Sequence, residues 1–172
     1  MILATKRLTL REMTLNDVDD LLEVFSDPEV MQFYPKPFDR QMTQSWVKRN
    51  IQRYTQHGFG LWALILKQSG KLIGDCGLVV QEVDGVEEVE IGYHVRRDLW
   101  GLGIATEAAQ ACRDYGVNQL GCDKLISLIN PANRASRRVA EKNGMKLIKE
   151  MEWRGQPTCV YLYQAAVRLL IR

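Results

Sequence analysis

Apolar positions recur with two periods along this chain, every second residue in some segments and every three to four residues in others. The first period is typical of a half-buried strand and the second of an amphipathic helix. Strand-like segments span 6–12, 61–67, 72–82, 86–95, 124–129, 146–153 and 158–163. Helix-like segments span 15–25, 39–54, 106–119 and 134–143. The order β-α-α-β-β-β-α-β-α-β-β predicts a mixed α/β sheet with helices on its faces.

Turn residues separate these segments. Asp84-Gly85 predicts a hairpin between two strands, and Gly144 is placed to end the fourth helix. The last two strands pair as a hairpin around Gly155. No repeat, low-complexity tract or linker interrupts the pattern, so residues 1–172 are expected to form one domain.

A glycine-rich turn, Trp100 to Ala105, joins the strand at 86–95 to the helix at 106–119. Such a turn points backbone N–H groups outward at the positive end of a helix, which favours an anion such as a phosphate. Arg96 and Arg97 add positive charge just before it. The alternative is plain turn chemistry, because paired glycines are common where helices begin.

The strand at 86–95 carries polar side chains on one face. Alternation groups the residues of the two faces as Val89, Ile91, Tyr93 and Val95 against Glu88, Glu90, Gly92 and His94. Because this strand leads into the glycine turn, we expect burial on both faces, which places Glu90 and His94 in a cleft. The alternative is a half-exposed hairpin strand with a solvated acidic face, and a bulge would change the facing.

Asn133 and Ser136 form an N-x-x-S pair at the start of the fourth helix. One interpretation is structural, with Asn133 as the N-cap and Ser136 in the first turn. The other is that both polar groups point toward the ligand of the glycine turn. The neighbouring arginines 134, 137 and 138 either are solvated surface or help to hold a phosphate.

Composition excludes several classes of function. The net charge of +2 is too small to indicate binding of nucleic acid or of an anionic membrane. The apolar run Leu61 to Leu66 is too short to cross a bilayer, and no signal peptide is recognisable, so a cytoplasmic location is expected. Four cysteines without C-x-x-C spacing, together with His57 and His94, support neither a metal site nor a disulfide framework.

Four ordered motifs resemble the GNAT acetyltransferases, most closely the RimJ/RimL-like N-acetyltransferases. They are Glu90-Ile-Gly-Tyr93, Trp100-Gly-Leu-Gly-Ile-Ala-Thr-Glu-Ala108, Asn133-x-x-Ser136 and Glu141-Lys-Asn-Gly-Met145. The opening Thr5-Lys-Arg-Leu-x-Leu-Arg11 is also similar to that branch. The resemblance covers nearly the whole chain and implies a single domain whose sheet is mixed, mostly antiparallel and of about seven strands, with helices on both faces.

The resemblance implies acetyl-CoA as co-substrate and assigns its binding site. The implied residues are Tyr93, His94, Val95, Trp100, Gly101, Leu102, Gly103, Ile104, Ala105, Thr106, Asn133 and Ser136. Trp100 replaces the Gln or Arg that opens the family's turn pattern, as is usual in the RimJ/RimL-like branch. Many relatives have a tyrosine on the fourth helix that protonates the leaving thiolate, but Ala140 stands at that position and makes Ser136 the best-placed substitute.

The expected reaction is direct attack of an amine on the thioester. Glu90 removes the amine proton through water, the Val95 N–H polarises the carbonyl, and Ser136 serves the thiolate. The acceptor is the N-terminus of a peptide or a small amine, held by the first two helices and their aromatic loop 33–38; the alternative is that the aromatic residues of this loop only pack in the core. An acidic cluster over 82–90 favours a cationic acceptor; the alternative is plain hairpin surface, which is the favoured interpretation for Glu82 and Asp84 at the turn. A catalytically silent acyl-CoA-binding sensor is the alternative, and the state of assembly is monomer or homodimer.

Overall fold

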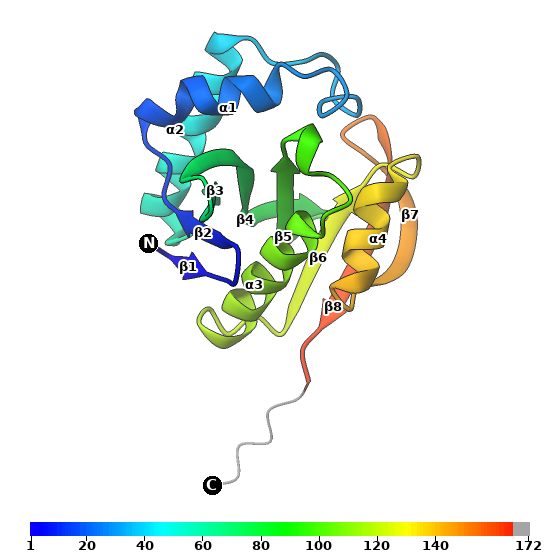
Figure 1. The fold of residues 1–172 in the computed structure, drawn as a ribbon. Helices are drawn as coiled ribbons and strands as arrows, with labels where there is room; N and C mark the ends of the chain where they lie inside the picture. The colour runs from blue at the N-terminus through cyan, green and yellow to red at the C-terminus, as the bar shows by residue number, and fades with distance from the viewer. Residues whose placement is uncertain (167–172) are drawn as a thin grey trace, which may run out of the picture.

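The predicted strands form one sheet (Figure 1). The computed structural model describes residues 1–166, within which eight strands lie in the order β1-β2-β3-β4-β5-β6-β8-β7. Their bounds are Leu3–Ala4, Leu8–Arg11, Leu61–Leu66, Lys71–Val83, Val86–Val95, Lys124–Ile129, Lys146–Trp153 and Gln156–Gln164 for β1 to β8. Within this part of the chain, neighbouring strands are antiparallel except β5 and β6, which are parallel. The mixed, mostly antiparallel sheet is confirmed; the last six residues of the predicted domain lie outside the described residues.

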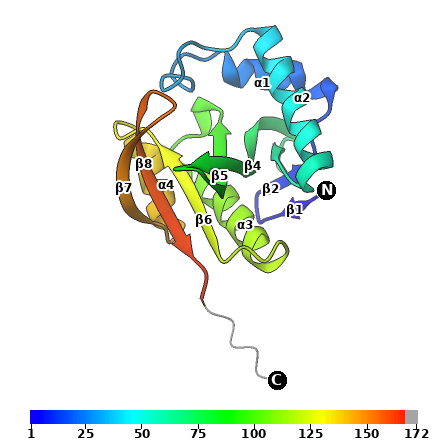
Figure 2. The ribbon, with the colours of Figure 1, turned by 180° about the vertical axis from the view of Figure 1, so that it is seen from behind.

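Helices cover both faces of the sheet (Figure 2). On one face, α1 (Val18–Phe25) and α2 (Arg40–His57) bury their apolar sides against β3 and β4. On the other, α3 (Ile104–Asn118) and α4 (Arg134–Lys142) pack on the central strands around Trp62 and Leu78. Each fully buried side chain of this size stabilises the fold by roughly 1.5–3 kcal/mol. No described helix is both long enough and apolar enough to span a bilayer.

The structure differs from the sequence prediction mainly at segment ends. β1 has only two residues, too few to show a periodic pattern, and it forms because Leu3 pairs with Leu10. The first helical segment begins as a 3₁₀ turn, Leu15–Asp17, before α1. The helix α3 begins at Ile104 rather than Thr106, because Gly103 ends the turn and serves as its N-cap.

A glycine on β4 brings two strands together beside the predicted site. Gly74 has φ +149° and lies opposite Val95 of β5. A Cβ at this position would lie 1.9 Å from the carbonyl oxygen of His94, so a residue with a side chain does not fit. Gly74 thus allows the end of β5 to lie close against β4.

Candidate active site

The strands β5 and β6 part at Glu90. They share one main-chain pair, Glu90 with Ile126, although β5 continues to Val95. Beyond that pair, side chains link the strands: the Ser127 hydroxyl donates to the Ile91 carbonyl at 2.9 Å, and the Leu128 N–H donates to Glu90 Oε1 at 3.4 Å. The last residues of β5 are therefore not paired with β6.

Val95 lies at this parting with its N–H directed away from β4. The Arg96 N–H donates to the Ile73 carbonyl at 2.8 Å, so Val95, one position earlier, occupies a non-hydrogen-bonded position opposite Gly74. Its carbonyl accepts a 2.7 Å bond from Trp100 Nε1. The Val95 N–H therefore points toward the side on which β6 has separated from β5.

The glycine turn begins where β5 ends. Gly101 and Gly103 both have φ +76°, a conformation that other residues adopt only with strain. A Cβ at Gly101 would meet no atom within 4 Å, and one at Gly103 would meet only the Arg7 guanidinium at 3.5 Å. Both glycines are exposed, and the first N–H groups of α3 follow them directly. The turn can thus present backbone donors to an anion.

Arg7 supports this turn, a role that the sequence pattern did not show. Its guanidinium donates to the Leu102 carbonyl at 2.7 Å and pairs with Glu107 of α3 at 2.6 Å. Burial alone would raise the pKa of Glu107, but hydrogen bonds from Thr5 and Arg7 outweigh it and hold the pKa below its ordinary value. The N-terminal strand region is thereby fixed to the first turn of α3.

The two arginines expected to add charge at the turn are both paired. Arg96 binds Asp98 at 2.7 Å, and Arg97 binds Asp27 at 3.0 Å. Their charge is offset by these carboxylates, which leaves the backbone N–H groups as the donors that the turn can present to an anion. The partner of Arg97, Asp27, lies 70 positions earlier in the chain, so the sequence pattern does not reveal this ion pair.

Glu90 and His94 lie on one face of β5 and Tyr93 on the other, as the alternation predicts, because the register between β4 and β5 is unbroken. Glu90 is half-buried and accepts a 2.8 Å bond from Gln81 Nε2. Burial raises the pKa of Glu90 above its ordinary value, although the hydrogen bonds from Gln81 and Leu128 oppose the shift. A carboxylate with a raised pKa is better suited to accept a proton near neutral pH.

The other acids of the predicted acidic cluster differ from Glu90. Glu88 pairs with Lys124 at 2.6 Å, and Asp84 pairs with Lys149. Glu82 and Glu87 are exposed. Glu88 and Glu90 are thus the half-buried members of the cluster, and Glu90 differs from Glu88 in having no ion pair among the described residues.

The N-x-x-S pair caps the fourth helix, as the structural interpretation predicts, and the Ser136 hydroxyl remains available for a second role. Asn133 Oδ1 accepts the Ser136 N–H at 3.1 Å, so Asn133 is the N-cap of α4. The Ser136 carbonyl accepts a 3.1 Å bond from the Tyr93 hydroxyl, which fixes α4 to β5. Within residues 1–166 the half-buried Ser136 hydroxyl has no hydrogen-bond partner. Ala140 is buried on the same helix.

His94 has neighbours that the sequence analysis did not predict. Its ring lies on the α1–α2 side of the sheet, where Nδ1 is 2.8 Å from Asp75 of β4 and Nε2 is 2.9 Å from the Tyr34 hydroxyl. Asp75 is fully buried and also accepts a 2.8 Å bond from Trp46 Nε1. A single acidic residue inside the apolar run 72–80 was the available signal for this cluster.

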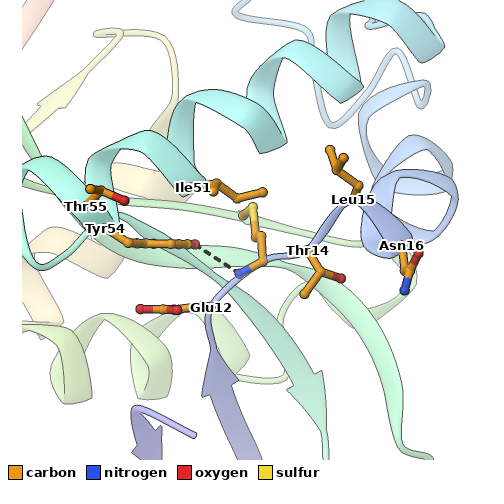
Figure 3. Close-up of a pocket in the computed structure, with 8 residues that line it drawn as sticks. Glu12, Thr14, Leu15, Asn16, Ile51, Tyr54 and Thr55 are labelled. Atoms are coloured by element: carbon orange, nitrogen blue, oxygen red, sulfur yellow. Dashed lines mark hydrogen bonds between the residues drawn. The ribbon is translucent and has the colours of Figure 1, made fainter.

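A separate pocket of about 610 Å³ lies between the β2–α1 connection and α2 (Figure 3). It is lined by Glu12, Met13, Thr14, Leu15, Asn16, Ile51, Tyr54 and Thr55. The Met13 N–H donates to the Tyr54 hydroxyl at 3.2 Å and joins its two walls. No residue of the predicted site lines this pocket.

Sequence comparisons relate this chain to known proteins. Residues 7–146 match the family described as "Acetyltransferase (GNAT) domain". The chain is 41% identical over 160 residues to "Uncharacterized protein YkkB" of Bacillus subtilis, covering 92% of this chain and 93% of that protein. It is 34% identical over 137 residues to "Uncharacterized N-acetyltransferase p20" of Bacillus licheniformis, covering 78% and 76%.

Among solved structures, the fold is similar to that of RimL, a ribosomal L7/L12 alpha-N-protein acetyltransferase, in complex with coenzyme A. The TM-score is 0.77 at 19% sequence identity, over 95% of this chain and 97% of that chain. At this identity the likeness concerns the fold, and the bound coenzyme is a property of the neighbour.

Proposed function

Because this chain belongs to the GNAT family of N-acetyltransferases, we propose that it transfers the acetyl group of acetyl-CoA to a primary amine by direct attack. The observation that carries the proposal is the open glycine turn at the start of α3, adjacent to the end of β5 where β6 has separated. The acceptor is the N-terminus of a peptide or a small amine.

The turn is suited to the pyrophosphate of acetyl-CoA. Gly101 and Gly103 leave open space beside outward backbone donors at the positive end of α3. We assign the binding of acetyl-CoA to the predicted set around them, with the Val95 N–H as the group that polarises the thioester carbonyl. Tyr93 contributes by fixing α4 to β5 through the Ser136 carbonyl. The His94 side chain lies on the opposite face from Tyr93, so it is the backbone at 94 that borders this set.

Glu90 acts on the proton of the acceptor amine, and Ser136 acts on the departing thiolate. Glu90, half-buried and with a raised pKa, takes a proton from the ammonium form of the acceptor through water. The free amine then attacks the thioester carbon, and the C–S bond breaks. The Ser136 hydroxyl, which has no partner within residues 1–166, donates a hydrogen bond to the departing thiolate, and the thiolate takes its proton from water.

A catalytically silent acyl-CoA-binding module is the second candidate, and one observation favours it. Ala140 occupies the position at which many relatives have a tyrosine, and its buried side chain offers no proton.

Thiol release discriminates the two candidates. The purified protein is incubated with acetyl-CoA and a panel of free amino acids, spermidine, and peptides beginning with Ser, Ala or Met. Amine-dependent thiol release supports the transferase. Calorimetric binding of acetyl-CoA without release across the panel would instead establish the binding module.

A further inference from the structure

A carboxylate, an imidazole and a phenol are connected in series beneath the loop between α1 and α2. Asp75 Oδ2 accepts from Trp46 Nε1, and Asp75 Oδ1 lies 2.8 Å from His94 Nδ1. His94 Nε2 lies 2.9 Å from the Tyr34 hydroxyl. Asp75 is fully buried, and the His94 side chain is 13% exposed. None of these side chains takes part in the steps assigned to Glu90 and Ser136.

The donors and acceptors fix the direction of the hydrogens. A carboxylate accepts only, so the Nδ1 of a neutral His94 carries the proton that binds Asp75. Nε2 then has a lone pair and accepts from the Tyr34 hydroxyl. The oxygen of Tyr34 is left with its own lone pairs, which can accept a proton from a further group.

Packing holds the series in place and leaves Tyr34 at its outer end. The His94 ring makes edge or tilted contacts with Phe25, Trp46 and Tyr34 at centroid distances of 5.2–5.6 Å. Tyr34 belongs to the loop expected to contact the acceptor, and it lies on the same side of β5 as Glu90. Tyr34 and His94 are both half-buried, and the phenol is the end of the hydrogen-bonded series.

Acetyl transfer from an ammonium acceptor requires two protons to leave the nitrogen. The first leaves before attack, because only the free amine is nucleophilic. The second leaves after the N–C bond has formed, as the charged nitrogen becomes an amide. The thiolate takes up one proton and the solvent receives the other. A Glu90 that still holds the first proton cannot accept the second, so a second acceptor near the nitrogen is useful.

We propose that Tyr34, His94 and Asp75 form a relay that removes the second proton, a proposal that rests on the proposed function. As the C–S bond breaks, the nitrogen proton moves to the Tyr34 oxygen while the Tyr34 proton moves to His94 Nε2. The resulting imidazolium pairs with Asp75 and later releases its proton to water. Tyr34 is the catalytic residue here, and His94 and Asp75 are positioning residues that act through it.

Charged groups from every element around the relay set its pH dependence. They are Asp75 on β4, Glu90 on β5, Arg49 and Arg53 on α2, and Arg154 between β7 and β8. Burial first, and then the charges of Asp75 and Glu90, raise the pKa of Tyr34 above its ordinary value of 10.0. The phenol therefore keeps its proton throughout an assay from pH 6 to pH 9.

Comparison of Tyr34→Phe with Glu90→Gln at pH 7 and pH 9 tests the relay, using the best acceptor from the amine panel. Tyr34→Phe should lower kcat about tenfold or more at both pH values, because the second proton must leave at any pH. The KM for acetyl-CoA should change less than about twofold. The loss in Glu90→Gln should fade by pH 9. Tyr115→Phe, on the other face against Trp62, is the matched control and should retain the parent rate.

The protonation of His94 gives a readout that does not depend on turnover. The chain has two histidines, so nitrogen-15 labelling of histidine yields two ring systems, and His57→Gln assigns them. Neutral His94 should carry its proton on Nδ1, and the Nε2 resonance should shift in Tyr34→Phe.

Three results would overturn the relay. One is a parent-like kcat in Tyr34→Phe, or a loss that disappears at pH 9 as in Glu90→Gln. The second is a neutral His94 protonated on Nε2. The third is a parent protein that binds acetyl-CoA but acetylates no amine. That result would remove the proposed function and the relay with it, whereas an active parent with an unaffected Tyr34→Phe would remove the relay alone.

Discussion

At the scale of single residues, burial determines what Glu90 can do. Because burial raises its pKa, Glu90 can hold a proton at a pH closer to neutral than an exposed glutamate can. We predict that Glu90→Gln lowers the transfer rate about tenfold or more near pH 7 and much less at high pH, where free amine is abundant. The exposed neighbour Glu87 provides the control variant Glu87→Gln. A pH–rate profile parallel to that of the parent would remove Glu90 from the mechanism.

Thermal melting of Glu90→Gln tests whether burial raises the pKa of Glu90. An acid whose pKa is raised by folding favours the folded state while protonated, and this contribution is lost as the pH rises through the folded-state pKa. Glu90→Gln removes the charge that burial disfavours, so its Tm should exceed that of the parent at pH 8 and approach it near pH 4. Equal Tm differences at the two pH values would contradict the raised pKa.

Substitutions of Ser136 and Asn133, which lie within one turn of α4, should affect catalysis and stability respectively. Ser136→Ala should lower kcat about tenfold with little change in affinity for acetyl-CoA, because a hydrogen bond to a developing charge contributes roughly 1.5–3 kcal/mol. Asn133→Ala should instead lower the Tm by about 2–4 °C through loss of the N-cap. Steady-state kinetics and thermal melting distinguish the two, and an unchanged turnover in Ser136→Ala, with chemistry rate-limiting, would exclude the serine.

At the scale of elements, the turn between β5 and α3 depends on open space as well as on backbone conformation. Gly103→Val should reduce acetyl-CoA binding at least tenfold, since the new side chain would cover the backbone donors. Gly121→Val is the matched control, because Gly121 has a similar φ of +71° and no atom within 4 Å of an added Cβ. Calorimetry on both variants distinguishes a loss of acetyl-CoA affinity caused by covering the backbone donors from one caused by strain at a positive φ. Equal losses of affinity in the two variants would contradict the assignment of the turn.

The elements also show where prediction from sequence succeeds. Within residues 1–166, periodicity identified the four α-helices and seven of the eight strands, because these segments bury one face over many residues. The facing of β5 was predicted as well, since its register with β4 contains no bulge. β1 was missed because two residues carry no period, and its formation depends on pairing with β2.

At the scale of the whole molecule, the missed parts of the site are contacts between distant segments. Asp75, His94 and Tyr34 come from β4, β5 and a loop, and no spacing rule joins residues 19 and 60 positions apart. Arg7 reaches α3 across 100 positions in the same way. The glycine turn was predictable because its chemistry is local. The proposed relay and the contact of Arg7 with α3 depend instead on how the sheet brings separate strands together.

The central claim, direct transfer of acetyl to an amine, is tested most directly by a single-turnover reaction analysed by mass spectrometry. The protein is mixed with acetyl-CoA and the best acceptor of the panel, and the thiol, the acetylated amine and the intact protein are measured together. Direct attack predicts one acetylated amine for each thiol released and no acetylated protein intermediate at any time. Release of thiol with transient acetylation of the protein, or binding of acetyl-CoA with no acetylated amine, would contradict it.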